Sequence, residues 1–340
     1  MQPQIKSPDL SHLKGLTTEI GLIQHCKLGI PDLSFGYSID DCARALIAIY
    51  QYLEIYQDQS VLPLAKIYLN YIKKAKIKGG YFHNFADQNG IFIDQIGSET
   101  STARTIWALG YIVNREDISK QNASVAREML LDLPPIENLK YIRSKAYALI
   151  GFCFLKDYEK VKKMADAISE SYEENKATNW FENNLSYANA ILPYSLFLAF
   201  DLLKDGRCLK IATESLLFLD KTMRIDSIPS PIGHTGWDFG SNDKPVYDQQ
   251  VIEATDMILA ATAGSLASSE IRDGQIVRDW FGWFTGFNIN KVSLLDETNG
   301  ACFDSLTKEG RNLNQGAESM VCYLLAHLAI SDSGVVAPLK

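Results

Sequence analysis

The fold is decided by one loop and the helix that follows it, Phe35-Gly36-Tyr37-Ser38-Ile39-Asp40-Asp41-Cys42-Ala43-Arg44-Ala45-Leu46. Ser38 is a good N-cap residue, and Asp41 stands three positions later, as in a capping box. Asp40 and Asp41 fall in the first helical turn, where the helix dipole favours negative charge, and Arg44 is one turn further on. The stretch indicates either a capped helix with a surface ion pair or a functional site at a helix start.

The same order of loop, aromatic residue, acid or amide, and small-residue helix recurs along the chain. Helical periodicity predicts amphipathic helices with one charged face and, between them, helices that are small and apolar almost all round. The amphipathic class comprises 17–28, 62–77, 121–133, 158–174, 207–223 and 270–285, and the apolar class comprises 39–53, 98–113, 142–155, 186–203, 249–266 and 315–331. The two classes alternate strictly.

Strict alternation has a structural consequence, because a helix that is apolar all round must be buried and an amphipathic helix can cover it. Six such pairs predict an all-α (α/α)6 toroid, with an inner ring of parallel helices sheathed by an outer ring. Residues 79–95 add a small β-hairpin, in which two aromatic-rich runs are joined by 87–90. No linker or break in composition divides the chain, so we expect a single domain over 1–340.

Composition excludes several classes of partner. The net charge of −8 and pI near 5.2 argue against binding to nucleic acid or an anionic membrane. The longest apolar stretch, 190–200, is too short to span a bilayer. The six cysteines form no C-x-x-C motif, which predicts core residues in a reducing compartment and no metal. No signal-peptide or cofactor motif is found, so we expect a cytoplasmic protein without a cofactor.

The toroid predicts where the site lies, because the inner helices all begin at the same end of the ring. Residues just before and within their first turns should therefore share one mouth. Aromatic faces stack on sugar C–H surfaces, and carboxylates and amides hydrogen-bond hydroxyl pairs. The expected substrate-binding residues are Tyr37, Asp40, Arg44, His83, Glu99, Arg104, Trp180, Tyr187, Asn189, Trp237, Asp238, Gln249, Gln250, Glu253, Asp304, Asn312, Asn314 and Gln315.

Three carboxylates are the candidates for catalysis. Asp41 is the first choice, with helix capping as its alternative role. Its expected partner is Glu182, which lies between aromatic and amide residues, or Glu318, which begins an otherwise apolar helix. One carboxyl would act as general acid and the other as base, as in glycoside hydrolysis.

Four blocks resemble a family of bacterial proteins of the six-hairpin glycosidase superfamily, often labelled as glycosidase- or glycosyltransferase-associated. They are GYSIDDCARAL (36–46), WFENNLSYANAILPYSL (180–196), YDQQVIEA (247–254) and NLNQGAESM (312–320), of which NQGAES is the most specific. The resemblance implies the toroid, a carbohydrate ligand and association with other carbohydrate-active enzymes. The chain departs from the family pattern at Cys42, where a polar residue is expected, and after Glu99, where Thr100 replaces an acid.

The leading hypothesis from the sequence is a glycoside hydrolase that acts on an oligosaccharide, with inversion favoured by analogy alone. A first alternative is a non-catalytic carbohydrate-binding or accessory protein of a glycan-processing system. A second is a lyase or epimerase of uronic acids. That chemistry needs an arginine that binds the substrate carboxylate, and Arg44, Arg104 and Arg143 are placed for it.

Overall fold

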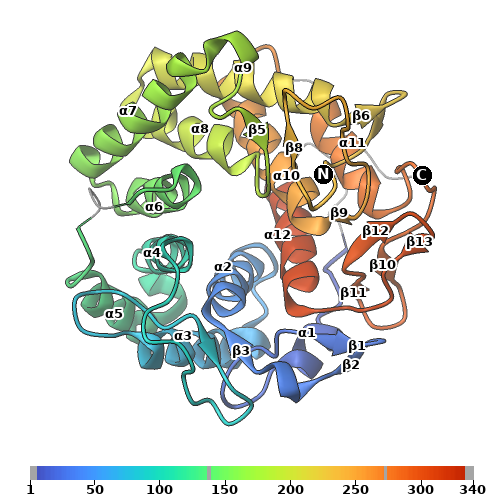
Figure 1. The fold of residues 1–340 in the computed structure, drawn as a ribbon. Helices are drawn as coiled ribbons and strands as arrows, with labels where there is room; N and C mark the ends of the chain where they lie inside the picture. Colours follow the sequence, from blue (N-terminus) through green and yellow to red (C-terminus); the bar gives the residue numbers. More distant parts are fainter. Residues whose placement is uncertain (1–5, 136–138, 272–273, 334–340) are drawn as a thin grey trace.

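The computed structural model describes residues 6–135, 139–271 and 274–333, and these form a ring of helices around a central axis (Figure 1). Each inner helix contacts the next, and the last contacts the first, so the inner ring is closed. The inner helices are α2 (Ile39–Tyr56), α4 (Glu99–Ile112), α6 (Ile142–Leu155), α8 (Ile191–Leu203), α10 (Val251–Ala267) and α12 (Ala317–Ser333).

The outer helices pack against the inner ring through one apolar face each. In α3, for example, Ala65, Leu69 and Ile72 are buried at helical spacing while Lys73 and Lys74 are exposed. The outer helices are α1 (Ser11–Leu16), α3 (Leu62–Ala75), α5 (Glu116–Leu130), α7 (Tyr158–Glu174), α9 (Gly206–Thr222) and α11 (Gln275–Phe284). The predicted all-α (α/α)6 toroid is confirmed.

Small residues on the inner helices allow close backbone packing. A Cβ added to Gly110 of α4 would lie 2.5 Å from the carbonyl oxygen of Gly151 in α6, and one added to Gly151 would lie 2.6 Å from that of Ile106. Only glycine fits at such distances. The small apolar composition that distinguishes the inner class in the sequence therefore sets how tightly the ring closes.

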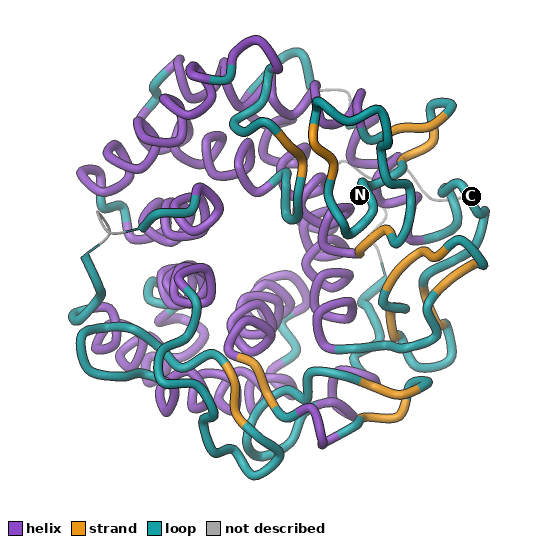
Figure 2. The backbone as a smooth tube through the Cα atoms, viewed as in Figure 1, coloured by secondary structure: helices purple, strands orange, loops and turns teal. Residues whose placement is uncertain are grey.

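The strands are short and lie in the loops (Figure 2), where they form small antiparallel sheets. The pairs are β1 (Cys26–Lys27) with β2 (Ile30–Pro31), β3 (Tyr37–Ser38) with β4 (Phe85–Ala86), β5 (Asn184–Leu185) with β8 (Trp237–Asp238), β6 (Arg224–Ile225) with β7 (Ile228–Pro229), and β10 (Leu295–Asp296) with β11 (Ala301–Cys302). A three-stranded sheet has the order β13 (Gly310–Arg311), β12 (Ser305–Thr307), β9 (Gln249–Gln250).

The predicted hairpin at 79–95 is present in its outer part. Ala86 and Phe92 form a β-bridge, and the backbone N–H of Gly90 donates to the carbonyl of Asp87 to close the turn. Gly90 has a φ of 79°, which glycine adopts without strain. The inner strand of this hairpin, β4, pairs with β3 and so joins the hairpin to the start of α2.

The prediction of a helix over 17–28 is wrong. The helix lies earlier, at α1, and 17–28 is extended, with bridges from Thr17 to Leu22 and from Ile23 to Tyr37. Gly21 explains the difference, because a Cβ there would lie 3.1 Å from the Tyr71 ring and 3.2 Å from the Cys42 sulfur. The segment is pressed flat against α2 and α3, and this tertiary packing overrides a helical periodicity in the sequence.

Other helix boundaries differ by a few residues. The largest differences are five residues, at the starts of α5, α8 and α11. Helix α8 begins at Ile191 instead of 186, because Ala188 has a φ of 48° that no helix accommodates. Within the described part of the chain, no helix combines the length and the apolar character needed to cross a membrane.

Candidate functional site

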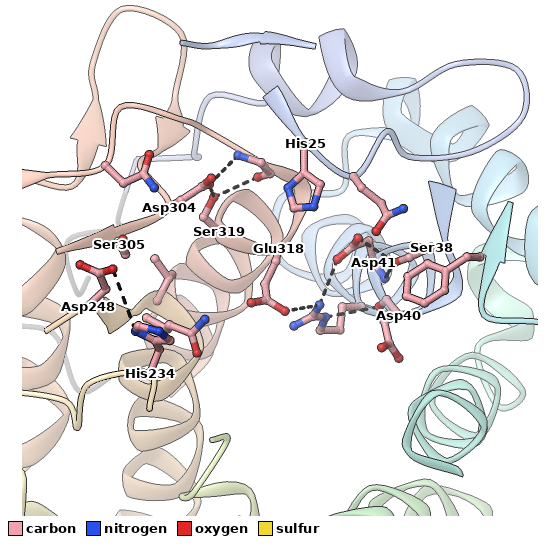
Figure 3. A pocket seen from close by; sticks show the side chains of 17 residues that line it. His25, Ser38, Asp40, Asp41, His234, Asp248, Asp304, Ser305, Glu318 and Ser319 are labelled. Atoms are coloured by element: carbon pink, nitrogen blue, oxygen red, sulfur yellow. Dashed lines mark hydrogen bonds and ion pairs between the residues drawn. The ribbon is translucent and has the colours of Figure 1, made fainter. Parts of the chain in front are cut away.

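A pocket of about 450 Å³ opens where α2, α10 and α12 begin (Figure 3). It therefore joins three parts of the chain that are remote in sequence, as the toroid predicts. Seven of the expected site residues line it: Asp40, Asp41, Arg44, Gln250, Asp304, Asn312 and Glu318. The lining also includes Gln24, His25, Ser38, Phe85, His234, Asp248, Val251, Ser305, Gly316 and Ser319.

Ser38 fixes the first carboxylate of the site. Its hydroxyl accepts a hydrogen bond from the backbone N–H of Asp41 at 3.1 Å and donates one to Asp41 Oδ2 at 2.7 Å. Ser38 therefore both caps α2 and orients the side chain of Asp41. Capping and a site role, which the sequence left as alternatives for Asp41, are compatible in this geometry.

Arg44 connects two carboxylates across the pocket. Its Nη2 donates to Asp41 Oδ1 at 3.0 Å and to Glu318 Oε2 at 2.9 Å. The two oxygens share one nitrogen and therefore lie within about 6 Å of each other, below the roughly 6.5–9.5 Å typical of inverting glycosidases. Arg44 and Asp41 have side chains only 4% and 8% exposed, whereas that of Glu318 is 47% exposed into the pocket.

The environment shifts the pKa values of these carboxyls in opposite directions. Burial raises the pKa of Asp41, and the nearby Arg44 guanidinium only partly offsets it. For Glu318, desolvation acts in the same direction, but Arg44 and Arg104 together hold the pKa below its ordinary value. The site therefore contains a carboxyl that tends to keep its proton next to one that tends to be ionised.

Asp40 faces the interior of the ring beside this pair (Figure 3). Its Oδ2 lies 3.0 Å from Nη1 of Arg104, and Arg104 Nη2 donates to the hydroxyl of Tyr147 at 3.2 Å. The other oxygen of Asp40 is buried and has no hydrogen-bond partner in the described residues. Arg104 thus contributes to the site indirectly, by positioning Asp40.

The start of α12 is held by Asp304. Its Oδ1 accepts the backbone N–H of Gly316 and the hydroxyl of Ser319, both at 2.6 Å. The β12–β9 pairing, with Ser305 opposite Gln250, connects the loop that carries Asp304 to the start of α10. Asp304 therefore has a structural contact on one oxygen while it lines the pocket.

Two histidines of the pocket wall come from loops. His25 packs edge-on against Phe35 at 4.8 Å between ring centres, and His234 has its Nδ1 4.0 Å from Asp248 Oδ2 (Figure 3). His25 is absent from the expected set because 17–28 was predicted to be an outer helix. His234 and Asp248 come before α10, and the toroid places residues that precede an inner helix at the mouth.

A second group of expected residues lies outside this pocket, around Arg143 of α6. Arg143 donates to Glu182 Oε2 at 2.6 Å and to Asn189 Oδ1 at 3.1 Å, and Asn189 Nδ2 donates to Glu253 Oε2 at 2.9 Å. Burial raises the pKa of Glu253. Tyr187 lies over this cluster, with the Arg143 guanidinium 5.5 Å from its ring centre. Of the two partners expected for Asp41, Glu318 thus lines the pocket and Glu182 does not.

Several expected sugar-binding residues are in the core. Trp180 is fully buried against Phe181 and Phe218, so its ring has no face open to a ligand. Gln249 is also fully buried, and its amide is bonded to Ser230 and Trp283. Tyr37, Asn189, Glu253 and Gln315 are likewise buried, and Gln315 bonds Asp296.

The remaining expected residues lie at the rim, Glu99 at the start of α4 and the others on loops. His83 bonds the carbonyl of Asp94, and Glu99 accepts the backbone N–H of Tyr141. Asn314 accepts the backbone N–H of Leu28. Trp237 donates to the carbonyl of Ser241, while Asp238 is exposed beside it. These side chains stabilise loops around the mouth, and none of them lines the pocket.

Similar solved structures share this fold. No family model matches the sequence, and no curated protein sequence is similar to it. A cellobiose 2-epimerase from Bacillus thermoamylovorans superposes with a TM-score of 0.73 at 12% identity over 97% of this chain and 96% of its own. A sugar epimerase from a ruminal bacterium gives 0.70 at 13% identity over 96% of both chains. An alpha-1,6-mannanase from Salegentibacter sp. gives 0.63 at 13% over 95% of this chain and 96% of its own.

The chain shares the (α/α)6 toroid fold of these enzymes. At these identities the likeness establishes architecture over almost the whole chain and leaves the reaction open. The resemblance inferred from the sequence is confirmed at this level, while the specific link to proteins with the NQGAES motif stays a prediction. Among the residues that the structure describes, no group of three or more His, Cys, Asp or Glu side chains is arranged to hold a metal ion.

Proposed function

We propose that this protein is a carbohydrate-active enzyme, and that it hydrolyses an oligosaccharide with Asp41 as the protonated general acid and Glu318 as the ionised carboxylate beside it. The observation that carries the proposal is that one nitrogen of Arg44 binds both Asp41 and Glu318, in surroundings that shift the pKa values of the two carboxyls in opposite directions. Neighbouring carboxyls whose environments separate their pKa values are the usual arrangement for acid and base roles. The acid would protonate the leaving oxygen, and the ionised carboxylate would act on water or the sugar carbon.

The mannanase provides independent support. An inactive variant of that enzyme carries replacements at two consecutive aspartates and was solved with alpha-1,6-mannotetrose. Asp40-Asp41 is the only pair of consecutive aspartates in this sequence, and both line the pocket. The short separation of Asp41 and Glu318 argues for retention of configuration instead of the inversion expected by analogy.

A second candidate is epimerisation or isomerisation of a free sugar, because His25 and His234 line the same pocket. A histidine near neutral pH can take a proton from the carbon next to the carbonyl of an open-chain sugar, and another can return it. A uronic-acid lyase is not favoured, although a polysaccharide lyase shares the fold at a TM-score of 0.61. Arg44, Arg104 and Arg143 are each already bound to carboxylates of the chain itself.

One experiment separates these reactions. The protein is incubated in D₂O with alpha-1,6-mannotriose, cellobiose or mannose, and products are followed by NMR. A hydrolase releases shorter sugars without deuterium on carbon, whereas an epimerase or isomerase exchanges the proton next to the carbonyl. Hydrolysis of an oligosaccharide, lost in Asp41→Asn, supports the main proposal. Deuterium exchange without cleavage would support the second, and saturable binding without turnover would indicate a binding protein.

A further inference from the structure

A layer of buried side chains lies about one and a half turns into the inner helices, and Arg44 is its one member that also lines the pocket. In every inner helix the sixth residue is buried, and these residues are Arg44, Arg104, Tyr147, Leu196, Asp256 and Cys322. Five residues of α-helix rise about 7.5 Å, so this layer lies deeper in the ring than the helix starts at the mouth. Contacts between neighbours confirm a common level, since Arg104 bonds Tyr147 and Arg44 lies 3.5 Å from the Cys322 sulfur.

The charges in this layer are matched, with one exception. Arg44 is bound by Asp41 and Glu318, and Arg104 is bound by Asp40. Asp256 is only 4% exposed, and its Oδ2 has no hydrogen-bond partner in the described residues. A buried carboxylate without a partner is costly, and such a group takes up a proton instead.

Asp256 interacts electrostatically with charged groups on other inner helices. Burial raises its pKa well above the ordinary value, and Glu253 adds to this, whereas Arg104 and Arg44 oppose it. The helices α4 and α10 are on opposite sides of the closed ring, so Arg104 and Asp256 influence each other across its interior (Figure 1). Buried atoms without a hydrogen-bond partner among the described residues are also found on Asp40 of α2 and Arg104 of α4.

We propose that this layer is the floor of the sugar-binding site and that neutral Asp256 hydrogen-bonds a hydroxyl of the sugar unit that enters deepest. A protonated carboxyl offers one donor and one acceptor, which is what a sugar hydroxyl needs in return. The charges of the floor are balanced within the protein, so it suits an uncharged sugar unit better than a uronate or a sugar phosphate. This inference rests on the proposed function for its ligand class.

The function of Asp256 also explains why a polar group is kept where an apolar one would stabilise the fold. An unsatisfied buried polar group destabilises the native state, and replacing it with an apolar group of similar size is neutral or stabilising. If Asp256 served the fold alone, removing it would lower stability. If it binds sugar, Asp256→Leu should lose affinity while its unfolding temperature stays equal or rises.

The test measures binding of cellobiose, mannose and alpha-1,6-mannotriose at millimolar concentration by calorimetry, together with thermal unfolding. Asp256→Leu should weaken binding at least about tenfold, as expected for loss of a buried hydrogen bond. Asp256→Asn keeps a donor and an acceptor, so it should stay within about threefold of wild type. Thr262→Val is the matched control, because Thr262 lies further along α10 and also has a buried unpartnered hydroxyl.

Each outcome decides the inference. Equal binding by Asp256→Leu and wild type would overturn it, as would equal losses in Asp256→Asn and Asp256→Leu, or no binding of any of these sugars to the wild-type protein. Failure of the proposed function has a different signature. In that case the expected binding pattern is found but no sugar is cleaved. Conversely, if Asp256→Leu cleaves the sugar with an unchanged KM, the proposed role of Asp256 in sugar binding is wrong and the proposed hydrolase activity stands.

Discussion

Two arginine clusters occupy different sides of the ring mouth and differ in what they leave free. Arg44 binds Asp41 and Glu318, and the side chain of Glu318 is still 47% exposed to a pocket. Arg143 binds Glu182 and Asn189, and Asn189 in turn donates a hydrogen bond to buried Glu253. The first cluster keeps a carboxylate available to a ligand, whereas the second uses its polar groups on one another.

The difference shows that polar residues at a helix start are not functional by composition alone. Both clusters combine an arginine, acids and a nearby aromatic residue, and the sequence predicts a catalytic carboxylate in each, Asp41 in the first and Glu182 in the second. What separates them is whether the structure has already paired their hydrogen-bonding groups. The following predictions test this distinction, beginning with the largest effect.

The strongest contrast is expected for the carboxyls of the Arg44 cluster. Asp41→Asn and Glu318→Gln should each lower the rate of reducing-sugar release about 10²- to 10⁴-fold, the usual contribution of a general acid or base. The unfolding temperature should change little in Asp41→Asn, because the amide keeps an acceptor for Arg44, whereas Glu318→Gln should lower it, because the ionised carboxylate that balances buried Arg44 becomes neutral. Full activity in either variant would remove that residue from the mechanism.

The matched change in the other cluster is Glu182→Gln. Activity should stay within a few-fold of wild type, since Glu182 does not line the pocket. Stability should fall by about 2 kcal/mol, because the 2.6 Å charge-assisted bond to Arg143 becomes a neutral one. Urea unfolding of the two proteins gives this value. A loss of activity as large as that in Glu318→Gln would contradict this distinction and indicate that both clusters belong to one functional site.

A smaller effect is expected at Ser38, which acts on the Arg44 cluster from outside. Its hydrogen bond lowers the pKa of Asp41, so Ser38→Ala should raise that pKa and move the alkaline limb of activity to higher pH. Loss of the N-cap should also cost about 1 kcal/mol of stability. A pH–rate profile and a denaturant titration measure the two effects. A limb that moves to lower pH would contradict the assigned role of Asp41.

The sequence predicts the ring well because its signal is physical and repeated. Burial of one helix class under another requires the alternation of small apolar and amphipathic segments, and Gly110 and Gly151 show why the inner class must be small. The same alternation locates Asp41, Gln250 and Glu318 at one mouth. The sequence predicts helix starts less accurately. Because the predicted start of α8 is five residues too early, the sequence alone does not show which residues of α8 lie at the same depth in the ring as those of the other inner helices.

The pairing of side chains could not be predicted. Nothing local to Glu182 indicates that Arg143 binds it, and Trp180 resembles an exposed stacking residue until the packing of Phe218 against it is known. His25 was missed because Gly21 turns a helical pattern into an extended segment through contacts with remote residues. The sequence alone does not single out Asp256. Its place in the buried layer is recognised only when the six inner helices are compared residue by residue from the first residue that the structure gives each of them.

The central claim is that Asp41 works protonated and Glu318 works ionised, and the pH dependence of kcat/KM tests it most directly. The pKa of Glu318 is lowered from 4.5, so activity should fall on the acid side only below that pH. The pKa of Asp41 is raised from 3.8, so activity should fall on the alkaline side as its proton is lost above that value. The account predicts a bell-shaped profile whose acid limb disappears in Glu318→Gln and whose alkaline limb disappears in Asp41→Asn, in whatever activity remains. A profile that both substitutions leave unchanged would contradict it.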